Sequence, residues 1–255
     1  MYYRFLKSFS GNYKLSVSRK IPAVIHKVIA HTPDLMTVIF RPLKRCPNYK
    51  PGQFLHLALD QYDPTSHWPE SRIFSIANSP TRAETLKITY SIKGHYTSRM
   101  FKELKEGRQV WLKLPFGSFD LTGLEYDIVL IAGGTGITPF TAFLEWAIDN
   151  SISNKIMFFY GVREKVRIIY EDLIKECCKS LTNFQYFYHI EQPECKNLKN
   201  IIPGKLEINK IYHKTSEMNN PSYCISGPYD MTQSFKLFLE KKLENVNNIL
   251  VDEWE

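Results

Sequence analysis

The stretch DIVLIAGGTGITPFTAFLEWAI, residues 127–148, decides the fold class of this chain. The unbroken apolar run from Ile128 to Ala132 has the composition of a buried strand, and the glycine-rich residues 133–136 end it. The apolar periodicity that follows predicts a helix, which Thr138 can cap and in which Pro139 suits the first position. A strand that leads through a bare turn into a helix start directs backbone N–H groups at one point, which favours phosphate binding.

This stretch has two interpretations. It is a phosphate-binding loop, or it is a glycine-rich turn in an α/β core, because a short glycine motif specifies little without its context. Pro139 stands where the usual dinucleotide fingerprint has its third glycine, so the stretch is not a standard Rossmann signature. The rest of the chain has to decide between the two.

Length and composition limit the class of protein. The 255 residues suffice for one large core or for two domains of about 100–150 residues, and we favour two. Apolar runs stay below the roughly 18 residues of a membrane span, and the N-terminus lacks the apolar middle of a secretory signal, so we expect a cytoplasmic protein without a membrane span. The five cysteines form no CxxC pair, which indicates neither a disulfide framework nor a metal site.

The net charge of +7 favours an acidic partner. We expect no nucleic acid, because the sequence shows no helix of clustered Arg and Lys, no zinc-finger spacing and no RNA-binding aromatic motif. One group of basic residues is either a docking surface or a solvated helix face: Lys93, Arg99, Lys102, Lys105 and Arg108.

The residues before the central stretch predict an all-β region with one short helix. Strands are indicated on both sides of a turn at residues 32–34 and again within residues 49–59, 71–80, 86–90 and 109–114. Thr97 or Ser98, just before the helical residues 100–107, would offer donors at a helix start and so a second phosphate site. Arg72 beside Phe74 suits a planar anionic ligand, or it is an exposed strand arginine.

Beyond residue 148, strands and helices alternate. Strands are indicated at residues 155–160, 184–189 and 222–226, and helices near 171–179, after 203 and at 231–243. Such alternation favours a parallel sheet covered by helices, and the change of pattern falls near residue 120.

In order and spacing, these pieces resemble the ferredoxin–NADP reductase-like flavoenzymes over roughly residues 22–255. Arg72-Ile73-Phe74-Ser75 looks like the R-x-Y/F-S flavin motif of that family, and residues 94–97 look like its G-x-x-S/T pyrophosphate element. Residues 133–139 resemble its nucleotide loop. Further matches are Pro51-Gly52-Gln53, Pro115-Phe116-Gly117, Tyr160-Gly161-Val162-Arg163 and Ser226-Gly227-Pro228-Tyr229-Asp230-Met231.

The resemblance implies two domains after an arm at residues 1–20. Residues 21–121 would form an antiparallel β-barrel that binds FAD, and residues 122–255 an α/β domain with a parallel sheet that binds NADH or NADPH as substrate. The cofactor-binding residues that it implies are Arg72, Ile73, Phe74, Ser75, Gly94, Thr97, Ser98, Gly133, Gly134, Thr135, Gly136, Thr138, Pro139, Gly161, Arg163, Gly227, Pro228 and Trp254.

The resemblance also implies roles. Arg72 would pair with the FAD pyrophosphate and Phe74 would pack on the flavin or ribityl region. The catalytic residues would be Ser75, near the hydride-accepting flavin nitrogen, and Ser226, which would place the nicotinamide against it. Trp254 with its neighbour Glu253 either lies over the flavin or belongs to an ordinary tail.

Two features depart from the family pattern. Relatives often carry Cys-Gly-Pro where this chain has residues 226–228, Ser-Gly-Pro, so the usual thiol near the nicotinamide is missing. The sequence also lacks a plant-type C-x4-C-x2-C motif, so we expect no iron–sulfur centre.

The function implied is an FAD-dependent oxidoreductase that takes hydride from NAD(P)H and passes electrons to a protein acceptor, such as a ferredoxin or an oxygenase component. The alternatives are a non-catalytic electron-transfer subunit and a reductase of free flavin. We favour bound FAD, because Arg72 and residues 94–97 both address a pyrophosphate, which riboflavin and FMN lack. NADH is expected over NADPH because Glu191 would repel a 2′-phosphate, although Arg163, Lys165 and Arg167 oppose this expectation.

Overall fold

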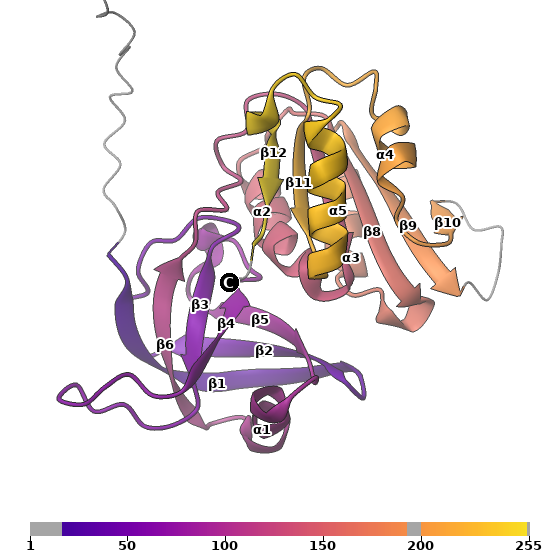
Figure 1. Ribbon diagram of the computed structural model, residues 1–255. Coiled ribbons are helices and arrows are strands. Elements are labelled where there is room, and N and C mark those ends of the chain that lie inside the picture. The colour runs from indigo at the N-terminus through magenta and orange to yellow at the C-terminus, as the bar shows by residue number, and fades with distance from the viewer. Residues whose placement is uncertain (1–16, 193–199, 254–255) are drawn as a thin grey trace, which may run out of the picture.

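The computed structural model describes residues 17–192 and 200–253, and two six-stranded sheets organise this part of the chain (Figure 1). Every strand pair of the first sheet is antiparallel. Every strand pair of the second sheet is parallel. The predicted fold class, an antiparallel near-barrel followed by an α/β domain, is confirmed. None of the helices in these residues is long and apolar enough to cross a lipid bilayer.

The first sheet runs in the order β4-β3-β6-β1-β2-β5. Its apolar residues alternate with the strand period of two, since Val110, Leu112 and Leu114 of β6 are fully buried while their neighbours Trp111 and Lys113 are partly exposed. The strands are β1 (Arg19–Thr32), β2 (Leu35–Pro42), β3 (Phe54–Ala58), β4 (Ser71–Ser75), β5 (Leu86–Ser91) and β6 (Gln109–Phe116).

One helix, α1 (His95–Glu103), packs against the barrel core through Tyr96 and Met100. It begins earlier than the sequence predicts. Gly94 is its N-cap, and the side chain of Thr97 bonds back to the Gly94 backbone, so Thr97 and Ser98 lie inside the first turn rather than before it. The prediction of a helix over residues 100–107 was therefore wrong at both ends: the capping interaction starts the helix earlier, and Leu104 leaves it with an extended backbone.

The second sheet runs in the order β10-β9-β8-β7-β11-β12 and carries helices on both faces (Figure 1). Alternate residues of β7 separate the two cores: Leu130 packs in the cluster that includes α2 and α3, and Val129 in the cluster of α4 and α5. The strands are β7 (Ile128–Gly133), β8 (Ile156–Glu164), β9 (Phe184–Gln192), β10 (Ile201–Pro203), β11 (Ser222–Ser226) and β12 (Ile249–Val251). The helices are α2 (Thr138–Asp149), α3 (Glu171–Ser180), α4 (Ile208–Lys214) and α5 (Tyr229–Glu240).

The strand order reverses between β7 and β11. From β7 the chain adds β8 and β9 on one side, and it then returns to add β11 and β12 on the other. Such a switch point leaves a crevice at the carboxyl ends of the two central strands, where ligands bind in open α/β sheets. Gly133 ends β7 and Ser226 ends β11, so the topology brings the predicted nucleotide loop and the Ser226 segment together.

Polar contacts join the barrel to the region of the second, parallel sheet. The buried carboxylate of Glu145, on α2, accepts hydrogen bonds from Lys87 Nζ at 3.1 Å and from the Ser79 backbone N–H at 2.8 Å. On the segment between β8 and α3, the Tyr170 hydroxyl bonds to Thr89 of β5. These contacts hold the two regions around a shared cavity.

Candidate functional site

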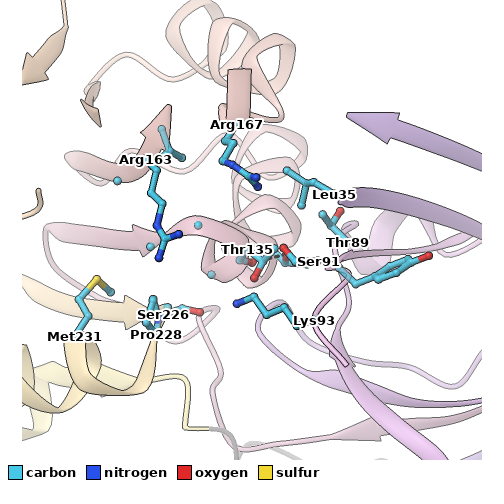
Figure 2. Close-up of a pocket in the computed structure, with 18 of the residues that line it drawn as sticks. Leu35, Thr89, Ser91, Lys93, Thr135, Arg163, Arg167, Ser226, Pro228 and Met231 are labelled. Atoms are coloured by element: carbon cyan, nitrogen blue, oxygen red, sulfur yellow. Dashed lines mark hydrogen bonds between the residues drawn. The ribbon is translucent and has the colours of Figure 1, made fainter. Parts of the chain in front are cut away.

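A cavity of about 860 Å³ lies between the two sheets (Figure 2). The barrel contributes β4, β5 and the turn between β1 and β2, and the second sheet contributes the carboxyl ends of β7, β8, β9 and β11. Most of the predicted site residues line this cavity: Ile73, Phe74, Ser75, Thr97, Gly133, Gly134, Thr135, Gly136, Thr138, Gly161, Arg163, Ser226, Gly227 and Pro228.

The other predicted residues lie elsewhere. Gly94, Ser98 and Pro139 are not part of the lining, and Trp254 lies outside the described residues. Arg72 is also not part of the lining, because its side chain is half exposed and its Nη2 pairs with Glu70 at 2.9 Å. Its guanidinium carbon lies 5.0 Å from the ring centroid of Tyr96, in the first turn of α1.

The start of α1 is the barrel-side candidate for a phosphate. The hydroxyl of Thr97 accepts the backbone N–H groups of Lys93 at 2.9 Å and Gly94 at 3.1 Å, so it is committed to the cap. The first backbone N–H groups of any helix lack intrahelical acceptors and attract anions. Arg72 beside this turn adds a planar cation that can bind two phosphate oxygens at once.

The loop after β7 is the second candidate. A Cβ on Gly136 would lie 2.3 Å from the backbone carbonyl oxygen of Ser226, and one on Gly133 would lie 2.8 Å from Cδ of Pro228. Gly134 has a φ of 55°, which favours glycine. The loop therefore packs against residues 226–228 with no room for a side chain at residue 133 or 136, and residues 133–136 border the cavity.

The start of α2 lies one residue earlier than predicted, so Thr138 and Pro139 both occupy other positions than expected. A 3-10 turn, Gly134–Ile137, runs directly into the helix, so Ile137 already has helical angles and occupies the cap position. Thr138 is the first helical residue, and its hydroxyl donates to the carbonyl of Thr135 at 2.7 Å. Thr138 therefore ties the loop together rather than capping the helix, and Pro139 follows at the second position.

The two serines predicted as catalytic both line the cavity, from opposite sides. Ser75 is the buried last residue of β4. Ser226 is fully buried at the end of β11, and its hydroxyl donates to Oδ2 of Asp252 at 2.9 Å. The pairing with Asp252 was not predicted. Glu253, the acid named from the sequence, instead pairs with Lys236 at 2.8 Å, because neighbouring residues of an extended segment face opposite ways.

Charged groups at the ends of β8 and β9 define the far part of the cavity. Arg163 and Glu191 line it, and Lys205 Nζ lies 3.9 Å from the Glu191 carboxylate. Arg167 forms two hydrogen bonds to Asp34, of 3.0 and 3.1 Å. A hydrogen bond from the Thr32 hydroxyl, and then those from Arg167, hold the pKa of the Asp34 carboxyl below its usual value. Arg167 also lines the cavity, and its ion pair with Asp34 links the segment after β8 to the barrel.

Two of the five basic residues suggested as a docking surface, Arg99 and Arg108, form ion pairs with acids. Arg99 pairs with Asp60 at 2.7 Å and with Glu103 at 2.8 Å, and Arg108 pairs with Glu103 at 2.7 Å. The remaining charge of this group comes from lysines, so the solvated-face interpretation fits α1 better.

A pyridine dinucleotide and a flavin dinucleotide fit the donor set around this cavity. Each carries a pyrophosphate, and the cavity has one helix start on each side, with Arg72 at the first and the glycine loop at the second. The volume is also within the range of ligand sites.

Comparisons with known proteins agree with this geometry. A model described as "Oxidoreductase NAD-binding domain" matches residues 130–236. The reductase component of propane 2-monooxygenase from Mycolicibacterium smegmatis is 23% identical over 241 residues, which cover 89% of this chain and 66% of that protein. This chain spans about half to two thirds of the length of the curated relatives it matches.

Solved structures share the fold. The ferredoxin reductase of carbazole 1,9a-dioxygenase aligns with a TM-score of 0.76 at 20% identity, over 93% of this chain and 70% of that one. A ferredoxin NADP⁺ reductase from Neisseria gonorrhoeae, solved with bound FAD and NADP, aligns with a TM-score of 0.72 at 18% identity, over 91% and 97%. Taken with the motifs and the two-sheet architecture, these matches show that the chain contains an oxidoreductase NAD-binding domain and has the fold of the ferredoxin–NADP reductase-like oxidoreductases that it resembles.

Proposed function

We propose that this protein is a flavoprotein reductase that holds FAD, takes hydride from NAD(P)H and passes electrons to an acceptor protein. The observation that carries the proposal is one cavity with Ser75 and Ser226 on opposite walls and a helix start beside each wall. FAD, when bound, supplies the hydride-accepting chemistry. The residues of this chain would bind the two cofactors, orient them toward each other and exclude water from the cavity.

On the barrel side, Arg72 would exchange its partner Glu70 for the FAD pyrophosphate, next to the first turn of α1. Phe74 lines the cavity and would pack on the flavin or ribityl region. Ser75, at the end of the same strand, would hydrogen-bond near the hydride-accepting nitrogen. We also propose that the two domains divide near residue 121, since β6 ends at Phe116 and β7 begins at Ile128.

On the nucleotide side, the backbone of residues 133–136 would hold the coenzyme pyrophosphate, as free N–H groups at a helix start do. The Ser226 hydroxyl donates a hydrogen bond to Asp252, so its oxygen can accept a hydrogen bond from the nicotinamide carboxamide. Asp252 thus acts as a positioning residue for Ser226. This pairing supplies the orientation that a thiol supplies in many relatives.

We propose that NADH is the preferred coenzyme. Lys165 does not line the cavity, and Arg167 lines it but forms two hydrogen bonds to Asp34, so Arg163 is the main opposing basic residue. Glu191 lines the same part and would repel a 2′-phosphate. Steady-state kcat/KM for the two coenzymes tests this, and Glu191→Arg should move the ratio towards NADPH by about tenfold or more. A wild-type preference for NADPH would contradict the proposal.

The acceptor is proposed from the relatives, several of which are reductase or electron-transfer components of oxygenases. We infer an acidic ferredoxin-like or oxygenase protein as partner, in keeping with the net charge of +7. A reductase of free flavin is the second candidate. Protein that stays yellow after gel filtration and reduces ferricyanide with NADH would support bound FAD, whereas full loss of colour with retained flavin turnover would support the second candidate.

A further inference from the structure

His189, near the end of β9, has an unusual environment. Its side chain is 4% exposed and it lines the cavity, yet its Nε2 atom has no hydrogen-bond partner among the described residues. Leaving a buried polar atom unpaired destabilises a folded protein, so such an atom points to a ligand group that pairs with it.

The backbone carbonyl of Lys205 fixes which ring nitrogen carries the proton. It lies 3.3 Å from Nδ1, and because a carbonyl only accepts, Nδ1 carries the hydrogen and Nε2 presents a lone pair. Burial lowers the pKa of His189, so the ring is neutral at neutral pH. Nε2 therefore requires a hydrogen-bond donor from the ligand.

Glu191 stands two residues further along β9, on the same face of the strand, and lines the same cavity. Its carboxylate also only accepts hydrogen bonds. Two acceptors side by side match the two neighbouring hydroxyls of a ribose, since each hydroxyl can donate. A 2′-phosphate offers acceptor oxygens and negative charge, so it matches neither group.

We propose that His189 is a specificity-determining residue whose neutral imidazole accepts a hydrogen bond from an adenosine ribose hydroxyl and so favours a free 2′-hydroxyl over a 2′-phosphate. The inference rests on the proposed nucleotide-binding function and adds a second residue to the selection attributed above to Glu191.

The same geometry makes the selection depend on pH. A protonated imidazole donates from both nitrogens and carries a positive charge, so it attracts a 2′-phosphate instead of rejecting it. The charged groups around the ring come from β8, β9, the segment before α4, and α4 itself: Arg163, Glu191, Lys205, Glu207 and Lys210. Protonation adds one positive charge to this set, and discrimination should weaken in acid.

Isothermal titration with ADP-ribose and its 2′-phosphate tests the proposal, because the two probes differ in that phosphate alone and need no flavin. Wild-type protein should bind ADP-ribose at least about tenfold more tightly at about pH 7.5, and the ratio should fall several-fold at about pH 5.5. His189→Phe keeps a buried ring without nitrogen and should weaken ADP-ribose binding by about three- to tenfold.

His189→Gln is the matched control, because an amide does not titrate. In this variant the ratio of the two probe affinities should keep the pH dependence that comes from titration of the 2′-phosphate itself. It should lose the part that comes from protonation of His189. Thermal melting of each variant confirms that it is folded. If His189→Phe binds ADP-ribose like the wild type and His189→Gln keeps the full pH dependence, His189 is a core residue and this inference is wrong. If folded wild-type protein binds neither probe, the proposed nucleotide function fails with it.

Discussion

The two sides of the cavity differ in how far they are built before a ligand arrives. On the barrel side, Arg72 is half exposed and paired with Glu70, so it must change partners to bind a phosphate. On the nucleotide side, Gly133 and Gly136 are packed against residues 226–228. Ser226 is buried, and its hydroxyl donates a hydrogen bond to Asp252. The nucleotide side is therefore preformed, whereas under the proposed function Arg72 on the barrel side has to rearrange when FAD binds.

The largest expected effect breaks the preformed side. In Gly136→Ala the new Cβ would meet backbone atoms, the Ser226 oxygen at 2.3 Å and the Gly227 nitrogen at 2.6 Å, which cannot rotate away. The loop must shift, and a misplacement of about 1 Å can slow reaction about 100-fold, so stopped-flow flavin reduction by NADH should fall by that order. Gly123→Ala is the control, because this residue is exposed and its Cβ meets nothing within 4 Å. Equal rates in the two variants would remove the proposed contrast.

The preformed side was also the more predictable one. The strand, bare loop and helix of residues 127–148 were correct from sequence because each signal is local: an apolar run, glycines, then a helical period. The Ser226 pairing with Asp252 was missed because it depends on the parallel register of β11 and β12, in which Ile225 lies beside Val251. Sequence spacing does not fix such a register.

On the barrel side, the sequence identified a motif but not the contacts that its residues make. The motif at Arg72 was recognised, but its half-exposed position and its bond to Glu70 could not be read from the motif. Likewise, the sequence named Arg167 among the basic residues that could favour NADPH, and it gave no sign of the pairing with Asp34, which lies 133 residues away in the chain. Local patterns predicted which residue types gather at the cavity. They did not show which of the arginines already form ion pairs with acidic residues.

The second effect concerns Arg72 on the barrel side, which would exchange Glu70 for the FAD pyrophosphate. Arg72→Ala should weaken FAD binding about ten- to a hundredfold, because a charge-assisted bond to the pyrophosphate is lost. Glu70→Gln should strengthen binding by up to about fivefold, since it removes a competing exposed ion pair. Fluorescence titration of the apoprotein with FAD measures both. Unchanged affinity in Arg72→Ala would exclude this residue from the flavin site.

A third effect isolates the buried pair on the nucleotide side. Asp252→Asn should slow flavin reduction by about tenfold with little change in the nucleotide Kd, because it loosens the orientation of Ser226 rather than removing a binding contact. Ser226→Ala should act in the same way, and the double variant should be no slower than the slower single one, because both changes disrupt one unit. Additive losses would show that the two residues act separately.

The smallest effect concerns the bond between the two sides. Tyr170→Phe removes the hydroxyl that joins the nucleotide region to Thr89, which should cost about 0.5–1.5 kcal/mol. For a chain of this size the melting temperature should fall by about 2–4 °C per kcal/mol. The exposed Tyr126 provides the control, since Tyr126→Phe should leave the melting curve unchanged. A Tyr170→Phe melting curve identical to the wild type would mean that the bond adds nothing to stability.

The central claim, that FAD and a pyridine nucleotide meet in this one cavity for hydride transfer, is tested most directly by mixing FAD-loaded protein with NADH in an anaerobic stopped-flow experiment. The account predicts that the oxidised-flavin absorbance disappears completely, at a rate that saturates with NADH concentration, as a bound coenzyme next to bound flavin requires. Flavin that stays oxidised in saturating NADH, yet is reduced by dithionite in the same sample, would contradict it.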